Sequence, residues 1–150
     1  MLNWVKILCA VDFSESSRQA LEHAADLARR FGAELTLIHV REAPRVAGSE
    51  IVSPPELLQE EVRELENKLD EWRIRAEQTA SRPVRTVLAR GSPPLEIVRA
   101  AESGTFDLVV TGTKARKGLG RMLLGSVAER VVREAQCPVL VARRPPDWGD

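Results

Sequence analysis

The sequence has few of the residues that build redox or metal centres. Its 150 residues include two cysteines and two histidines. Cys9 and Cys137 are far apart, lie in apolar segments and form neither a CxxC pair nor a zinc-binding spacing, so we interpret them as buried cytosolic thiols. His23 and His39 are too few for a metal site. The place of His39 near the end of an apolar segment favours a packed strand residue over a catalyst.

The chain also has no excess of charge and no long apolar run. Its 22 Lys and Arg residues balance 22 Asp and Glu residues, which gives no general reason to expect nucleic acid or an anionic membrane as a partner. No apolar segment reaches the ~18 residues that a membrane span needs. The N-terminal apolar run is short and leads into an acidic turn, unlike a signal peptide. We therefore predict a cytoplasmic protein whose length suits one domain over residues 1–150.

Short apolar segments alternate with segments of helical periodicity along the chain. This alternation predicts an α/β fold with a parallel sheet and right-handed crossovers. The apolar stripe after Glu56 lasts under three heptads, which indicates one helix lying on a sheet instead of a coiled coil. Residues 43–55 contain three prolines and are expected to form a loop. The expected strands are 5–11, 34–40, 84–89, 106–111 and 137–142, and the expected helix caps are Ser14 or Ser16 (with Gln19 in a capping box), Ser92 and Ser126.

The segment 109–129, VVTGTKARKGLGRMLLGSVAE, carries the clearest functional signal. An apolar strand ends at Thr111–Gly112, and a loop without acidic residues leads to Gly125–Ser126, where Ser126 and Glu129 fit a capping box. Glycines allow a ligand to approach the backbone, and a helix N-terminus attracts anions. The segment predicts a site for the phosphates of a nucleotide, or alternatively a solvated basic loop before a capped helix. The loop cations are Lys114, Arg116, Lys117 and Arg121.

Asp12 is expected to lie opposite this segment. Ligands of open parallel sheets collect beyond the carboxyl ends of the strands where the strand order reverses. If strand 5–11 is central, Asp12–Phe13 faces Thr111–Gly112 there, and Asp12 accepts hydrogen bonds from ribose hydroxyls. A helix-start role for Asp12, favourable to the helix dipole, is compatible with this. A P-loop, the dinucleotide glycine pattern, paired carboxylates and a nucleophile–base pair are missing, so no catalytic residue is predicted.

Four stretches together resemble the universal stress protein family: VDFSE (11–15), LTLIHV (35–40), FDLVVTGT (106–113), and LLGSVAERVV followed by CPVLVAR. The resemblance extends from Val5 to Arg143. It implies a three-layer α/β fold with four helices and five parallel strands in the order 3-2-1-4-5, which is the adenine nucleotide alpha hydrolase-like architecture.

Members of this family that bind ATP resemble G-x2-G-x9-G-[ST] after the fourth strand. Gly112, Gly125 and Ser126 match this motif with the correct spacing, whereas Ala115 replaces the second glycine. If that backbone is left-handed, Ala costs roughly 1 kcal/mol, or about fivefold in affinity. The four loop cations offset a loss of that size, so we expect ATP binding to be retained.

The resemblance also implies roles for particular residues. Asp12 would contact the ribose. A Mg²⁺ ion bridging the phosphates is compatible with the sequence, although no dedicated carboxylate ligand is evident. The family's homodimer would form through the fifth strand. The expected adenine contacts are Ala10, Val40 and Thr111, the expected phosphate contacts are Gly112, Lys114, Ala115, Gly125, Ser126 and Val127, and the expected dimer contacts are Val139, Leu140, Val141 and Ala142.

Three functions follow as hypotheses. The first is a stress-response regulator that binds ATP or another adenine nucleotide, with slow hydrolysis at most. The second is a dimeric interaction module of the same fold that binds no nucleotide. The third is an enzyme such as a nucleotidyl transferase, which the sequence disfavours because the HxGH and SGGxDS phosphate motifs are missing.

Overall fold

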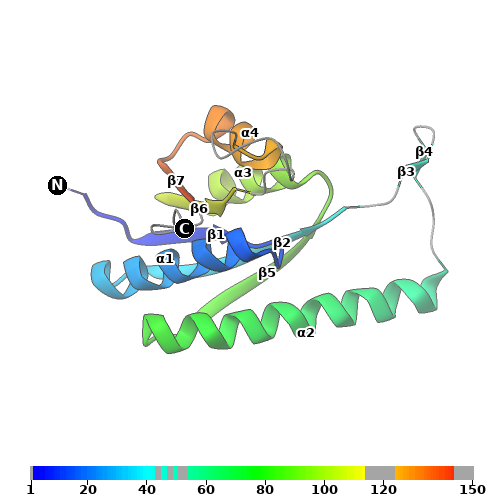
Figure 1. The fold of residues 1–150 in the computed structure, drawn as a ribbon, viewed down its shortest axis with the longest axis horizontal. Coiled ribbons are helices and arrows are strands. Elements are labelled where there is room, and N and C mark those ends of the chain that lie inside the picture. The colour runs from blue at the N-terminus through cyan, green and yellow to red at the C-terminus, as the bar shows by residue number, and fades with distance from the viewer. Residues whose placement is uncertain (1, 43–44, 47–48, 51–53, 114–123, 144–150) are drawn as a thin grey trace, which may run out of the picture.

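A sheet of five parallel strands forms the centre of the protein (Figure 1). The computed structural model describes residues 2–42, 45–46, 49–50, 54–113 and 124–143. The strand order β5-β2-β1-β6-β7 confirms the predicted order 3-2-1-4-5, since β3 and β4 belong to a separate hairpin. The strands of the sheet are β1 (Lys6–Ala10), β2 (Glu34–Arg41), β5 (Val84–Arg90), β6 (Leu108–Gly112) and β7 (Val139–Ala142).

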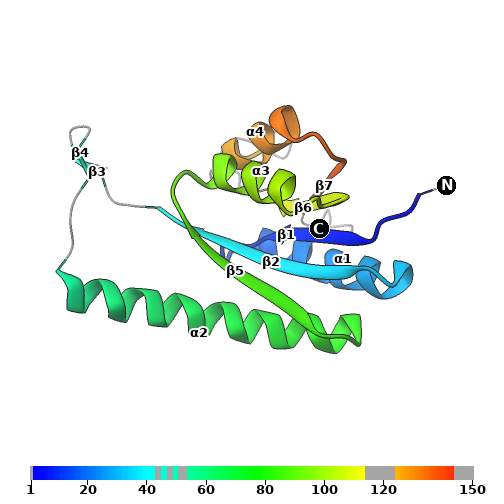
Figure 2. The same cartoon turned by 180° about the vertical axis from the view of Figure 1, so that it is seen from behind.

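Four helices cover the two faces of this sheet, which gives three layers. Helices α1 and α2 lie on one face and α3 and α4 on the other, as seen from both sides in Figures 1 and 2. Part of the expected 43–55 loop forms a two-stranded antiparallel hairpin, β3 (Arg45–Val46) and β4 (Ser49–Glu50). The helices are α1 (Glu15–Phe31), α2 (Pro55–Ala80), α3 (Pro93–Ser103) and α4 (Ser126–Glu134). Within the described ranges, none of them has the length and apolarity to cross a membrane.

Strand β1 is buried on both faces, as its continuous apolar sequence predicts. Ile7 and Cys9 pack toward α1 and α2, whereas Leu8 and Ala10 pack toward α3 and α4. Complete burial raises the pKa of the Cys9 thiol far above its ordinary value, because the thiolate would lose its hydration. Cys9 is therefore a neutral core residue.

The predicted caps Ser14, one of the two alternatives for α1, and Ser92 are confirmed, whereas the predicted cap Ser126 is wrong. Helix α1 is capped by Ser14, whose hydroxyl accepts a hydrogen bond from the Ser17 amide at 3.3 Å, so the Ser16–Gln19 capping box does not form. In α4 the N-cap is Gly125, and Ser126 is already the first helical residue. The expected C-terminal glycine of α1 is confirmed, because Gly32 has the left-handed φ of 65° that ends a helix.

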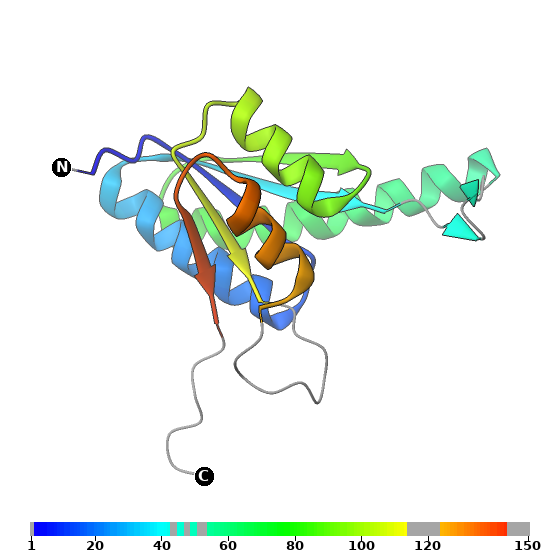
Figure 3. The ribbon, with the colours of Figure 1, turned by 90° about the horizontal axis from the view of Figure 1, so that it is seen from above.

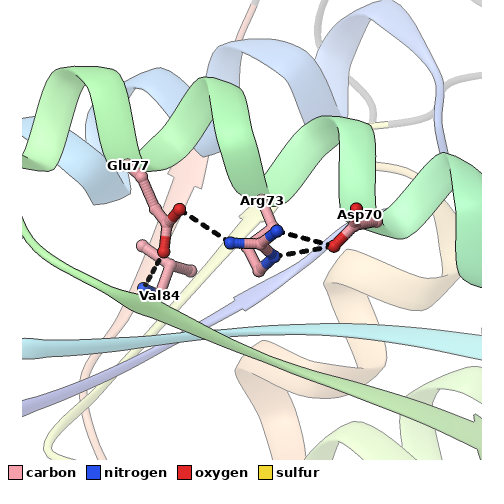
Figure 4. Close-up of polar contacts among 4 residues, drawn as sticks. All are labelled: Asp70, Arg73, Glu77 and Val84. Carbon is pink, nitrogen blue, oxygen red and sulfur yellow. Dashed lines mark hydrogen bonds and ion pairs between the residues drawn. The ribbon is translucent and has the colours of Figure 1, made fainter.

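The C-terminal half of α2 is anchored to the edge strand β5 (Figure 4). Arg73 pairs with Asp70 and Glu77, each at 2.7 Å, and Glu77 also accepts a hydrogen bond of 2.8 Å from the Val84 amide. The N-terminal half of α2 runs beyond the sheet toward the β3–β4 hairpin (Figure 3). The anchor fixes where α2 crosses the sheet, at the start of β5.

Candidate functional site

One pocket lies beyond the carboxyl ends of β1, β2 and β6, where the strand order reverses. It has a volume of about 640 Å³, including its opening to solvent. Helices α3 and α4 contribute their N-terminal turns to its wall. Within the described part of the chain, it is lined by Ala10, Val11, Asp12, Ser16, Ser17, Ile38, His39, Val40, Pro93, Ile97, Thr111, Gly112, Gly125, Ser126, Val127 and Ala128.

Eight of the ten predicted site residues are among these: Ala10, Asp12, Val40, Thr111, Gly112, Gly125, Ser126 and Val127. The other two, Lys114 and Ala115, lie outside the described residues, as do the loop cations Arg116, Lys117 and Arg121. The structure therefore brings the end of β1 and the β6–α4 segment together around one hollow. A ligand-binding role for these residues stays a prediction.

Asp12 is built into the start of α1. Its Oδ1 accepts hydrogen bonds from the Ser14 amide, at 3.0 Å, and from the Ser14 hydroxyl. The Asp12 amide in turn donates to the Ser17 hydroxyl at 3.2 Å. A hydrogen bond to an Asp side chain from the backbone amide two residues later forms a local turn, and here this turn precedes the N-terminus of α1. The carboxylate is thus held in the pocket wall by its own backbone neighbours.

Phe13 holds this turn in an uncommon backbone conformation. Its φ of 65° lies in the left-handed region, which costs an ordinary residue about 1–2 kcal/mol. The Phe13 ring stacks against His39, with ring centroids 4.5 Å apart, and meets the edge of Trp72 from α2 at 5.4 Å. These contacts offset the backbone cost, as expected for strain retained beside a site.

His39 is a packed strand residue, as the sequence indicates, and it also borders the pocket. Its Nδ1 lies 2.8 Å from the Val11 carbonyl oxygen. Because a carbonyl only accepts, Nδ1 carries the hydrogen of this bond. His39 therefore ties the end of β2 to the end of β1.

Gly112 is needed for close packing. A Cβ added to it would lie 2.5 Å from the backbone carbon and oxygen of Ser16 and 2.8 Å from the Ser17 amide nitrogen. Distances below 3.0 Å are not tolerated by backbone neighbours. Gly112 thus allows the end of β6 to meet the first turn of α1, which closes one wall of the pocket.

The first turn of α4 forms part of the described wall. Gly125 is extended, with φ −60° and ψ 154°, and its carbonyl accepts the Glu129 amide at 2.9 Å. The Glu129 carboxylate pairs with Arg133 at 2.9 Å instead of turning back to the cap. The predicted capping box of Ser126 and Glu129 therefore does not form. Because Gly125 is the N-cap, Ser126 is the first helical residue and lies beside backbone amides that have no acceptor within the helix.

Eight of the lining residues were not predicted as site residues, and four of these come from helices α1 and α3. Ser16 and Ser17 come from the first turn of α1, and Pro93 and Ile97 from the first turns of α3. Helix α1 follows β1 and helix α3 follows β5. The carboxyl ends of these parallel strands lie at the same edge of the sheet as the pocket, so the first residues of both helices could have been predicted to lie near it. In the described residues, no three His, Cys, Asp or Glu side chains are grouped to hold a metal ion.

The reversal of strand order and the pocket beyond it define a doubly wound α/β protein of the adenine nucleotide alpha hydrolase-like fold. The sequence profile of the Universal stress protein family matches residues 3–143. The chain belongs to this family.

Relatives in two organisms are similar over nearly the whole chain. Universal stress protein MJ0531 of Methanocaldococcus jannaschii is 39% identical over 150 residues, covering 93% of this chain and 82% of the relative. Universal stress protein YxiE of Bacillus subtilis is 38% identical over 146 residues, covering 92% and 98%.

Solved structures share the fold. UspA from Lactobacillus plantarum has a TM-score of 0.79 at 26% identity and covers 95% of this chain and 100% of its own. A universal stress protein in complex with cAMP has a TM-score of 0.74 at 23% identity, covering 94% and 98%. One from Archaeoglobus fulgidus in complex with dAMP has a TM-score of 0.67 at 22% identity, covering 94% and 99%.

Proposed function

We propose that this universal stress protein binds an adenine nucleotide, ATP in particular, in the pocket at the carboxyl ends of β1, β2 and β6, and acts as a stress-response regulator with slow hydrolysis at most. The observation that carries the proposal is the convergence of Asp12, the Gly112 backbone and the first turn of α4 around one pocket. Proteins of the same fold have been solved with cAMP and dAMP.

The pocket has an apolar wall, a carboxylate and a helix N-terminus, each of which suits a different part of a nucleotide. Ala10, Ile38, Val40 and Ile97 provide an apolar wall for the base. Asp12 would accept hydrogen bonds from the ribose, and the amides of α4 would donate to the phosphates. With no metal-binding group of side chains in the described ranges, Mg²⁺ would be held by phosphate oxygens and water.

Two measurements test nucleotide binding. Denaturing the purified protein and weighing the released small molecules by mass spectrometry detects a nucleotide carried through purification. Calorimetric titration with ATP and Mg²⁺ gives the affinity. Asp12→Ala should weaken binding about ten- to a hundredfold, because hydrogen bonds to a charged group contribute about 1.5–3 kcal/mol.

Gly125→Val tests the phosphate end of the pocket. The φ of −60° at Gly125 suits any residue, so this change adds bulk to the pocket lining without backbone strain. Val132→Ala on an exposed face of α4 is the matched control and should bind normally. Equal binding by the parent, Asp12→Ala and Gly125→Val would exclude this pocket as the ATP site, and no binding by the parent would leave the non-nucleotide interaction module as the function.

The replacement of the second motif glycine has its own test. If the backbone at residue 115 is left-handed, Ala115→Gly should tighten ATP binding about fivefold. Unchanged affinity would show that Ala is harmless at this position.

We also propose that β7 pairs with β7 of a second copy. It is an edge strand of the sheet, and its residues Val139, Leu140 and Val141 are half-buried while Ala142 is buried. An apolar edge strand is a ready surface for strand pairing. Light scattering should give twice the 16.6 kDa chain mass, and Val141→Lys should reduce it to one chain. A monomeric parent protein would refute the pairing.

A further inference from the structure

Phe13 links the pocket to helix α2. It lies in the short connection between the end of β1 at Ala10 and the Ser14 cap of α1, and it has a φ of 65°. Asp12, immediately before it, lines the pocket. The direction of the Asp12 backbone and side chain therefore depends on whether Phe13 keeps its left-handed conformation.

The Phe13 ring is held by groups from two other elements. His39 of β2 stacks against it with an interplanar angle of 34°, and Trp72 of α2 meets it edge-on at 79°. The ammonium of Lys68, one turn earlier in α2, lies 5.8 Å from the ring centroid. These arrangements are favourable for aromatic and cation–π contacts.

Trp72 is itself fixed in place. It packs against the core cluster beneath α1 and α2, and the neighbouring Arg73 pairs with Glu77, which accepts the Val84 amide (Figure 4). The position of the Trp72 ring thus follows the position of α2 on the sheet.

Neither Phe13 nor Trp72 lines the pocket within the described part of the chain, whereas Asp12 and His39 do. An effect of either ring on a ligand must therefore pass through the turn at Asp12 or through His39, which stacks on Phe13. We propose that Phe13 is a positioning residue for the adenine nucleotide site, with Trp72 holding its ring so that the left-handed turn keeps Asp12 in the pocket wall. This inference rests on the proposed nucleotide binding.

The central test compares two tryptophans. Trp72→Leu should weaken ATP binding about two- to tenfold in calorimetry, the range expected from loss of an aromatic pair. Trp72→Phe keeps an aromatic edge and should restore most of the affinity. Trp4→Leu is the matched control, because Trp4 forms a similar pair with Phe31, at 5.1 Å, on the edge of the core away from the pocket. Trp4→Leu should lower the melting temperature but leave the dissociation constant unchanged.

A double-mutant cycle locates the effect. Phe13→Leu should weaken ATP binding to a similar degree, and Phe13→Leu combined with Trp72→Leu should weaken it by less than the product of the single effects. Independent, multiplying effects would contradict transmission through Phe13. Equal dissociation constants for the parent and Trp72→Leu would overturn the inference while nucleotide binding stands.

Hydrogen exchange without ligand separates this inference from the proposed function. The Asp12 amide is bonded to the Ser17 hydroxyl and the Ser14 amide to Asp12 Oδ1. Trp72→Leu should speed exchange at both amides, and Trp4→Leu should not. If the parent binds no adenine nucleotide but this difference is seen, the proposed function fails and the link from α2 to the turn stands. No binding and no difference would refute both.

Discussion

The imidazole Nδ1 of His39 donates a hydrogen bond of 2.8 Å to the carbonyl of Val11, beyond the last backbone bond between β2 and β1. The Val11 amide already donates to the Ile38 carbonyl at 2.9 Å. The side chain therefore continues the ladder by one bond at the pocket edge. Without this donor the carbonyl of the buried Val11 would be unpaired, and the fold would be less stable.

We expect His39→Leu to lower the free energy of unfolding by about 1–2 kcal/mol, because the Val11 carbonyl loses its donor. Urea denaturation measures this change. His23→Leu is the control, since His23 is exposed on α1, and it should change stability by less than about 0.5 kcal/mol. Equal effects of the two substitutions would show that the bond to Val11 contributes nothing.

Gly112→Ala should lower stability by about 1–3 kcal/mol, because the added methyl group overlaps the backbone of Ser16 and Ser17. Thermal and urea denaturation measure the loss. Amide exchange should rise mainly in the first turn of α1, which has to move away. An unaltered melting temperature would mean that β6 and α1 separate without cost.

Glu77→Ala should lower stability by about 1–3 kcal/mol, since the Val84 amide loses its acceptor and Arg73 loses a partner (Figure 4). Glu77→Gln keeps a neutral acceptor and should fall between this variant and the parent. The control is Glu71→Ala, an exposed site on the same helix. Exchange of the Val84 amide reports whether the start of β5 is released; unchanged exchange in Glu77→Ala would contradict the anchor.

Asp26 should make stability depend on pH. Hydrogen bonds from Arg29 and Arg30 hold the pKa of its carboxyl below the ordinary value. A lowered folded-state pKa stabilises the fold above the unfolded pKa of about 3.9, and this contribution is lost as the pH falls through the folded pKa. Asp26→Asn should therefore be less stable than the parent at neutral pH, with the difference shrinking in acid. A constant difference at all pH values, measured by urea denaturation, would exclude this cause.

Much of the fold could be predicted from local patterns. The run VKILCAV indicated a strand covered on both faces, and the alternation of elements indicated a parallel sheet. The resemblance to the universal stress protein family, which extends from Val5 to Arg143, then supplied the strand order, and the structure confirms it. The caps were harder to predict. Ser14 and Ser16 are both good cap residues, and only the conformation of the whole turn from Asp12 to Ser17 selects Ser14.

The candidate site was predicted mainly from the end of the first strand and the segment 109–129, whereas the pocket also includes residues of α1 and α3. Ser16, Ser17, Pro93 and Ile97 border it because their helices begin where strands end at the same edge. The packing role of Gly112 was not expected, since a contact with α1 cannot be read from spacing along the chain.

The sequence by itself determined the kinds of elements, their order and the residues that could meet an anion, because period, burial pattern and glycine position act locally. Only the tertiary structure decided that Gly112 meets Ser16 and that the ring of Trp72 meets the ring of the left-handed Phe13. Each of these depends on the distance between segments far apart in the chain, and packing alone sets such distances.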